Sequence, residues 1–267
     1  MALPFFPPDN ALNILRVLAA TIILGYSCVT DWKIRRAPNE LWYVLGGIGL
    51  LFALYGYWEN NFDTSYLIWF VIGVLFIYAL VYMIFRVGGF GGADAKALIA
   101  IAILFPAPMY PLISLFGLDF PLGGGIMSPV FALAVLGNAV ALNIIVPLGM
   151  LVYNLVTTPA GELLGNPLGA FTGYKARIAD LKGKHLRLMH DYDETDNKVQ
   201  KQWVFKGTEI DDYSLGELSK WRDSGKIGDK VWVTPKLPFL IPITLGFLVA
   251  IFYGDILMQV VSTLMGR

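Results

Sequence analysis

Two aspartates stand at the edges of apolar segments, where a charged side chain calls for a chemical reason. Asp31 closes the first apolar run, and Asp94 opens a later one directly behind the glycine-rich stretch 88–93. Two carboxyl groups that lie close together resist double ionisation, so one stays protonated beside a charged neighbour. Such a pair can hydrolyse a peptide bond. The charged carboxylate takes a proton from water, and the protonated one polarises the carbonyl.

Each part of this pattern also has a simpler explanation. Acidic residues are common at helix N-termini, where they complement the helix dipole, so Asp94 could serve only as a cap. Asp31 could form an interfacial ion pair with one of the basic residues that follow it, Lys33, Arg35 and Arg36. The glycines could form only a turn between two spans. The residues by themselves leave these alternatives open.

The elements that must position the two aspartates are apolar helices. The chain has 267 residues, of which 56% are hydrophobic and 15% charged, so it is far less charged than a typical soluble domain. A bilayer is crossed by about 20 apolar residues in a helix. The composition therefore predicts an all-α polytopic membrane protein with six transmembrane helices, at 14–30, 41–58, 66–86, 95–115, 128–156 and 237–264.

The positions of Lys and Arg predict the orientation of these helices. The first-to-second connection, the third-to-fourth connection and residues 157–236 hold 18 of the 20 basic residues. We therefore expect these segments in the cytoplasm and both termini outside. The zero net charge does not suggest a nucleic-acid partner. Cys28 is the single cysteine, which excludes a disulfide framework and a CxxC zinc site, so we expect no metal and no cofactor.

The chain is expected to divide into three parts. Residues 1–156 form a membrane domain with five helices and both aspartates, residues 157–236 a small α+β cytoplasmic domain, and residues 237–267 the last helix. In the soluble part, the segment 161–173 is typical of a linker, and 175–181 favours a short helix. The alternating segment 184–207 predicts a β-hairpin that carries both histidines, His185 and His190, without a recognisable metal spacing.

Two more elements complete this soluble part. The segment 214–225 predicts a helix with Ser214 as N-cap, Glu217 three residues on, and Gly225 as its stop. The segment 230–234 then predicts a closing strand.

The residues around the two aspartates resemble the motifs of a known family. Asp31 is followed by basic residues and by Ala37-Pro38-Asn39, which is similar to the "D…IPN" loop of type IV prepilin peptidases, members of the GxGD membrane aspartyl proteases. The stretch GGADAK, residues 91–96, resembles their GxGDxK signature. With six spans and a late cytoplasmic domain, the chain looks closest to the archaeal preflagellin (archaellin) peptidase branch.

The resemblance implies a role for each matching residue. Asp31 and Asp94 would be the catalytic pair. The other motif residues would bind or orient substrate, and these are Pro38, Asn39, Gly91, Gly92, Ala93 and Lys96. Ala93 stands where the motif has its second glycine, which puts a positive φ at this position in doubt. Lys96 could orient the substrate or the pair, or could be a basic side chain that reaches up to the interface.

The resemblance also implies the substrate. Family members cut precursors of pilin-like subunits between a short basic leader and a long apolar helix, at the cytoplasmic face. Bacterial members also methylate the new N-terminus and often carry a cysteine-rich zinc segment, which this chain lacks, so we expect a peptidase without methylation. A weaker similarity links Pro235, Leu237 and Pro238 to the PAL element of presenilin-type proteases, although these prolines could simply mark a helix start.

Two other functions remain open at this point. A protease related to signal peptide peptidase or presenilin would cut deeper in the bilayer than the shallow position of both aspartates suggests. A transporter or scaffold would be expected to carry further charged residues in mid-span. The sequence shows none there, nor internal repeats.

Overall fold

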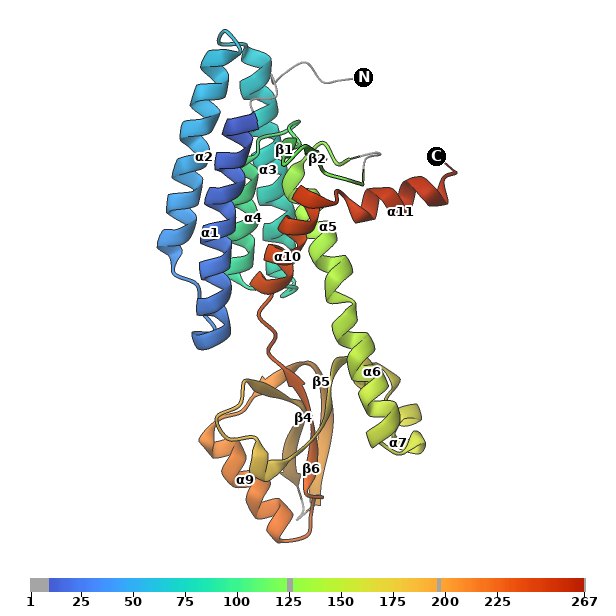
Figure 1. The fold of residues 1–267 in the computed structure, drawn as a ribbon. Coiled ribbons are helices and arrows are strands. Elements are labelled where there is room, and N and C mark those ends of the chain that lie inside the picture. Colours follow the sequence, from blue (N-terminus) through green and yellow to red (C-terminus); the bar gives the residue numbers. More distant parts are fainter. Residues whose placement is uncertain (1–9, 124–126, 196–197, 267) are drawn as a thin grey trace. The chain divides into compact units, whose positions relative to one another are not determined.

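The computed structural model describes residues 10–123, 127–195 and 198–266. The chain divides into two compact units (Figure 1). One consists of the described residues of Met1–Asn143 and Pro238–Arg267, and the other is Ile144–Leu237. The first is a helical bundle and the second contains the four-stranded sheet. Apolar helices and a small α+β part were both expected from the sequence.

The helical unit contains seven helices among its described residues. They are α1 (Asn10–Ile34), α2 (Asn39–Glu59), α3 (Thr64–Arg86), α4 (Gly92–Leu104), α5 (Phe131–Asn143), α10 (Leu240–Phe252) and α11 (Ile256–Leu264). By length and composition, four segments of the described chain could cross a membrane: α1, α2, α3 and Phe131–Thr157. The bent pair of α10 and α11 would make a fifth.

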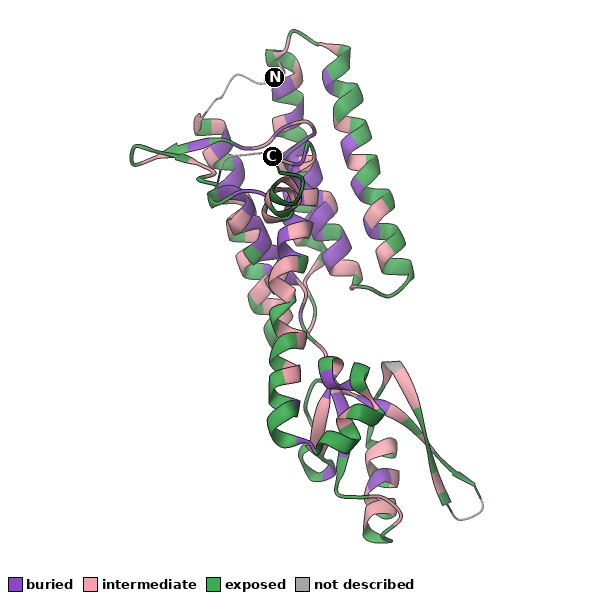
Figure 2. Cartoon of the chain, turned by 90° about the vertical axis from the view of Figure 1, so that its right-hand side faces the viewer, coloured by how far each residue is buried: buried purple, intermediate pink, exposed green. Residues whose placement is uncertain are grey.

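Exposed positions run along the outside of the helices of this unit (Figure 2), and many of them carry large apolar side chains. In α3, the buried residues form a narrow stripe of Tyr66, Gly73, Ile77 and Val81. Most of the other apolar residues of α3 are exposed, including Phe76, which is 47% exposed. An exposed apolar surface of this size agrees with a membrane location.

The fourth expected span is shorter than the range 95–115 that the sequence predicts. Helix α4 ends at Leu104, and the chain continues through Pro106 and Pro108 into a hairpin of β1 (Ile113–Leu115) and β2 (Leu118–Phe120). Proline lacks the backbone N–H that a helix needs and disfavours a helical residue before it, which explains the early end. With 13 residues, α4 is about 20 Å long, less than the thickness of the hydrocarbon core.

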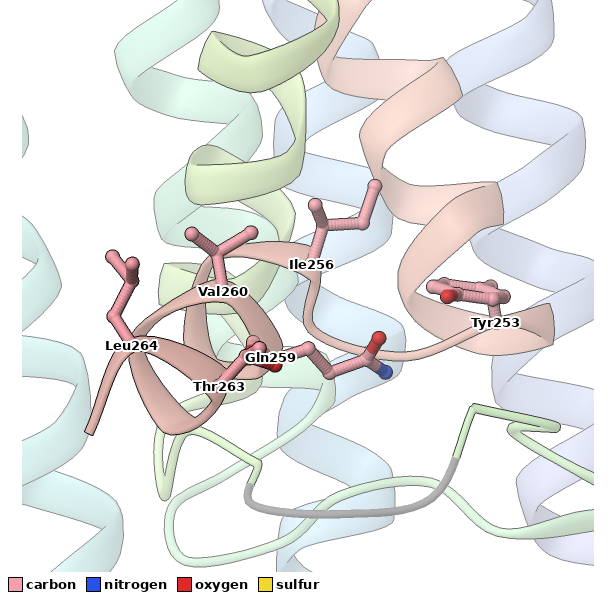
Figure 3. Close-up of a pocket in the computed structure, with 6 residues that line it drawn as sticks. All are labelled: Tyr253, Ile256, Gln259, Val260, Thr263 and Leu264. Atoms are coloured by element: carbon pink, nitrogen blue, oxygen red, sulfur yellow. The ribbon is translucent and has the colours of Figure 1, made fainter. Parts of the chain in front are cut away.

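The last expected span, 237–264, is bent by 65° between α10 and α11. Gly254 has a φ of +124°, and Asp255 caps α11 by accepting a hydrogen bond from Met258 N–H at 3.0 Å. A pocket at this bend is lined by α11 and Tyr253 (Figure 3). The buried Asp255 corrects the view that no charged residue lies inside a predicted span. Its role here is to end one helix and begin another.

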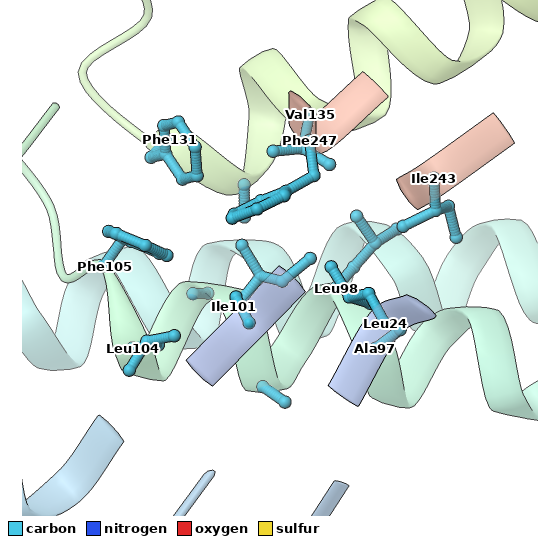
Figure 4. Packing of buried hydrophobic residues seen from close by; sticks show 14 of the residues in the cluster. Leu24, Ala97, Leu98, Ile101, Leu104, Phe105, Phe131, Val135, Ile243 and Phe247 are labelled. Atoms are coloured by element: carbon cyan, nitrogen blue, oxygen red, sulfur yellow. The ribbon is translucent and has the colours of Figure 1, made fainter. Parts of the chain in front are cut away.

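The core of the bundle lies between α1, α4, α5 and α10. The side chains that fill this core are completely buried and belong to one cluster (Figure 4); they include Leu24 of α1, Leu98 and Ile101 of α4, and Phe247 of α10. Helices also approach one another closely at glycine: a Cβ added to Gly49 of α2 would lie 2.8 Å from the backbone nitrogen of Leu104. The small residue therefore sets the distance between α2 and α4.

The second unit begins with helices and continues as a sheet. Its elements are α6 (Ile145–Thr157), α7 (Ala160–Gly165), α8 (Pro167–Thr172), β3 (Tyr174–Arg177), η1 (Ile178–Asp180), β4 (Leu186–Thr195), β5 (Lys198–Glu209), α9 (Asp212–Asp223) and β6 (Lys230–Pro235). The described strands pair in the order β3-β6-β4-β5, all antiparallel. The predicted hairpin and the closing strand are thus confirmed, and β6 takes an inner position.

Three predictions for this unit were wrong in detail. The segment 175–181 forms β3 and η1, because β3 pairs with β6 along its whole length. The supposed linker 161–173 contains α7 and α8. The N-cap of α9 is Asp211, whose carboxylate accepts a hydrogen bond from Ser214 N–H at 2.8 Å, so Ser214 is the third helical residue of the capping box. Gly225 follows α9 with a φ of +73°, as expected for a helix stop.

Candidate active site

Asp31 lies in the last turn of α1, where its side chain is half exposed. The start of α10 packs beside this part of α1, where Cys28 Sγ lies 3.4 Å from the backbone carbonyl oxygen of Leu240. In the described part of the chain, Asp31 forms no ion pair within 4.0 Å, although the charge of Arg35 acts on it through space. The simple ion pair with the following basic residues is therefore absent.

Asp94 is the third residue of α4 and is only 6% exposed. Its Oδ2 accepts a hydrogen bond from Gly91 N–H at 2.8 Å, so the capping role considered for this residue is real. Its Oδ1 has no hydrogen-bond partner among the residues that the structure describes. One carboxylate oxygen thus holds the start of α4, and the other is available for chemistry.

The two aspartates come together at one end of the bundle. The end of α1, which carries Asp31, and the start of α4, which carries Asp94, lie on the same side of the helical unit, near enough for the charge of Asp31 to act on Asp94 through space. Three helix ends lie on this side of the bundle: the end of α1 and the starts of α4 and α10 (Figure 1). A carboxyl pair expected from two distant motifs is therefore compatible with the fold.

The two motifs are also joined by a direct contact. Lys96 Nζ donates a hydrogen bond to Asn39 Oδ1 at 2.7 Å, from the second turn of α4 to the first residue of α2. Pro38 precedes α2 in an extended conformation and so ends the connection that follows Asp31. Lys96 therefore contacts the end of the connection that follows Asp31.

The glycines before Asp94 have distinct local roles. Gly88 has a φ of +77°, which favours glycine. Gly91 is the N-cap of α4, and a Cβ added there would lie 3.2 Å from Asp94 Oδ2. Gly92 and Ala93 are the first two residues of the helix, and Ala93 does not have a positive φ. The departure from the glycine motif at Ala93 therefore costs no backbone strain.

The start of α10 contributes residues that the motifs did not reveal. Cys28, one helical turn before Asp31, lies with its Sγ 3.0 Å from Thr244 Oγ1. The spacing of three between Cys28 and Asp31, which places them on one helix face, is the sequence signal that could have placed Cys28 beside the candidate site. Leu240 has no such signal, because it contacts Cys28 through a backbone carbonyl, which any residue can supply.

The proline segment before α10 divides between the two units. Pro238 belongs to the helical unit and precedes the Leu240 amide by two residues. Pro235 ends β6, and Leu237 is 50% exposed; both belong to the other unit. Only Pro238 is therefore connected to the candidate site by the contacts of its own unit.

Comparison with known proteins gives this arrangement its context. Residues 18–128 match the type IV leader peptidase family, and this range includes both aspartates and both motifs. Residues 165–256 match a second model, Archaeal Peptidase A24 C-terminus Type II, which covers α8, the four-stranded sheet and α10.

The chain belongs to the type IV leader peptidase family. As a member it is a peptidase, and its apolar helices agree with a membrane location. Three similar relatives are named preflagellin peptidase. That of Methanococcus maripaludis is 27% identical over 85% of this chain and 90% of its own length. That of Methanococcus voltae is 27% identical over 94% of this chain and 97% of its own length. That of Methanocaldococcus jannaschii is 22% identical over 94% of this chain and 99% of its own length.

In the described part of this type IV leader peptidase, no three His, Cys, Asp or Glu side chains lie close enough together to hold a metal ion. The pocket at the bend of α10 and α11 does not include either aspartate. It lies beside Tyr253, at the opposite end of α10 from Leu240, about 20 Å along the helix. The pair at the start of α4 is therefore the better candidate for the peptidase chemistry.

Proposed function

We propose that this peptidase removes the short basic leader from preflagellin-like and prepilin-like precursors. The observation that supports the proposal is that Asp31 and Asp94, from two separate motifs, lie at helix ends on the same side of the bundle. Relatives that match almost their whole length are named preflagellin peptidase, which supports this substrate class. The expected partners are precursor proteins with a basic leader followed by an apolar helix, and the surrounding lipid.

In the proposed mechanism, Asp31 is the general base and Asp94 the general acid. Asp31 is half exposed, so the attacking water can reach it, whereas Asp94 is buried. Asp31 takes a proton from the water while the oxygen attacks the carbonyl carbon, and protonated Asp94 gives its proton to the carbonyl oxygen. As the C–N bond breaks, Asp31 returns its proton to the leaving amine and Asp94 recovers one from the intermediate.

The membrane arrangement follows from the same geometry. The basic residues Lys33, Arg35 and Arg36 lie at the end of the bundle that holds both aspartates, and Arg86 ends α3 beside it. Because such residues favour the cytoplasmic side, we place the site at the cytoplasmic face, with residues 157–236 in the cytoplasm. In this arrangement α4 and the α10–α11 pair complete six membrane-embedded helices. Protease treatment of inverted vesicles should then cleave the sheet unit, and that of right-side-out vesicles should spare it.

The decisive experiment is cleavage of a purified precursor by the full-length protein in detergent. Asp31→Asn and Asp94→Asn should each abolish cleavage, because each removes one proton-transfer group. Asp63→Asn is the matched control, since Asp63 only caps α3 by accepting from Ser65 N–H at 2.9 Å. Retained cleavage in either site variant, with normal thermal stability, contradicts the aspartyl mechanism.

The same reaction tests the expected absence of methylation. Mass spectrometry of the mature product, formed in the presence of S-adenosylmethionine, should show a free α-amino group. A mass increase of one methyl group would disprove that part of the proposal and leave the peptidase mechanism untouched.

A further inference from the structure

Helix α6 has a single buried residue, Asn154, which lies in its last turn. Asn154 Nδ2 donates hydrogen bonds to Ala170 O at 2.8 Å and to Gly173 O at 2.6 Å, both at the end of α8. The ring of Tyr153 also contacts that of Tyr174 edge-on, with 6.0 Å between the ring centres. The segment that follows α6 therefore folds back onto the end of this helix.

The position of α6 brings this folded-back segment close to the membrane. Helix α6 is the second half of Phe131–Thr157, which could cross a membrane by its length and composition. Thr158 and Pro159 are the two residues between α6 and α7. Asn154 lies three residues before the end of α6, which is about 5 Å along the helix axis. The two hydrogen bonds thus hold the end of α8 within one helical turn of the point where the apolar segment ends.

The two short helices α7 and α8 expose their large apolar side chains. Leu164 of α7 is 82% exposed, and Leu168 and Phe171 of α8 are 64% and 39% exposed. The small residues Gly169 and Ala170 are buried instead. Large apolar side chains on the outside and small ones against the protein are expected of a segment whose outer face contacts lipid.

We propose that α7 and α8 form an interfacial segment that inserts Leu164, Leu168 and Phe171 into the membrane surface. The partner is the boundary between lipid headgroups and acyl chains, where apolar side chains of a helix are buried about 5–10 Å deep. Lipid fits better than a protein partner because the exposed face continues that of α6, where Val152 and Val156 are 62% and 82% exposed. The proposal depends on the membrane location and not on the identity of the catalytic residues.

The same segment attaches the sheet to the membrane surface. Thr234 Oγ1 of β6 donates to Thr172 O, the last residue of α8, at 2.6 Å. A Cβ added to Gly173 would lie 2.5 Å from Val233 O, so the backbones of α8 and β6 are in close contact. Helix α8 is therefore held by α6 on one side and by an inner strand of the sheet on the other. Its insertion sets the distance between the sheet and the lipid.

The test measures lipid contact in the full-length protein, reconstituted in vesicles of phosphatidylcholine. In a Cys28→Ser background, Leu164→Cys and Leu168→Cys each carry an environment-sensitive fluorophore. Phosphatidylcholine brominated in its acyl chains should quench both labels at least about twofold more than a label at Tyr213→Cys. Tyr213 is the matched control because it is 77% exposed on α9 of the same unit. Iodide in the water should quench in the opposite order.

Two results of this measurement overturn the proposal. Stronger quenching by iodide than by brominated lipid at Leu164 and Leu168 would show that both positions face water. Weak quenching by both agents would show that protein covers the face. If dilution into excess lipid then relieves this protection, the cover is a second copy of the chain.

The attachment of α8 to α6 is tested with a second variant. Asn154→Leu removes both hydrogen bonds, so lipid quenching of the label at Leu168 should fall toward the value at Tyr213. Asn60→Leu is its matched control, because Asn60 Nδ2 donates to Gly56 O at 2.7 Å in the other unit. Unchanged lipid quenching in Asn154→Leu, with an unchanged Tm, would show that Asn154 does not place α8 at the membrane.

Discussion

Lys96 Nζ donates a hydrogen bond to Asn39 Oδ1 across 2.7 Å, and this contact joins the two sequence motifs of the site. Asn39 stands eight residues after Asp31, and Lys96 stands two residues after Asp94. The bond therefore links the connection that carries one aspartate to the helix that carries the other. Loss of this bond is expected to affect the relative position of the two carboxyl groups.

Removing either partner of that bond should reduce cleavage. We expect Asn39→Ala and Lys96→Ala each to lower kcat/KM roughly fivefold, since both side chains are exposed and one hydrogen bond to a charged group contributes about 1 kcal/mol. The double variant should lose little more than either single one, because both changes remove the same interaction. Lys33→Ala, an exposed basic residue in the same connection, serves as control. Fully additive losses would show that the two side chains act independently.

The close approach of α2 and α4 should make Gly49 intolerant of a side chain. In Gly49→Ala, the added Cβ would lie 2.8 Å from Leu104 N, so the helices must separate at a cost of about 1–3 kcal/mol. Thermal unfolding in detergent should show a lower Tm than wild type. Gly47→Ala offers a control two residues away, because nothing lies within 4 Å of the added Cβ. An unchanged Tm for Gly49→Ala would mean that this packing distance is not fixed.

Restoring the glycine of the motif at Ala93 should not improve the enzyme. Ala93 is the second residue of α4 and has no positive φ, so glycine offers no relief there. We expect Ala93→Gly to retain wild-type kcat/KM and to lose less than about 1 kcal/mol of stability, because glycine is a poor helix former. A clear rise in kcat would indicate that the working conformation needs backbone freedom at this position.

The stability of the sheet unit should decrease in mild acid because of His190. Burial, and then the charge of Lys201, lower the pKa of His190 below its ordinary value. The ring packs edge-on against Trp203 at 4.9 Å, and its Nδ1 is buried without a hydrogen-bond partner. Since the unfolded chain binds the proton more readily, the stabilisation by the neutral ring is complete above about pH 6.5 and declines as the pH falls from there.

A pair of histidine variants tests this dependence. Between pH 7.5 and pH 5, the Tm of wild type should fall more than that of His190→Gln, which cannot take up a proton. His185→Gln changes an exposed histidine immediately before the same strand, β4, and should follow wild type. If His190→Gln and wild type lose stability in parallel, His190 does not control the acid response.

The sequence by itself indicated the candidate chemistry and determined much of the local structure. Local patterns specified the hairpin of β4 and β5 and the stop at Gly225, because each depends on neighbouring residues. The sequence also placed Asp31 and Asp94 at helix ends, since an apolar run that stops at a charged residue marks a boundary.

Only the tertiary structure decided which of these ends meet. The contacts of Cys28 with Leu240 O and with Thr244, and the Asn39–Lys96 bond, join residues that are far apart in the chain. Helical periodicity cannot show them, because a backbone carbonyl carries no sequence signal and a polar residue in an apolar helix can face several neighbours. Helix packing selects the neighbour, and at this end of the bundle it brings the candidate site together.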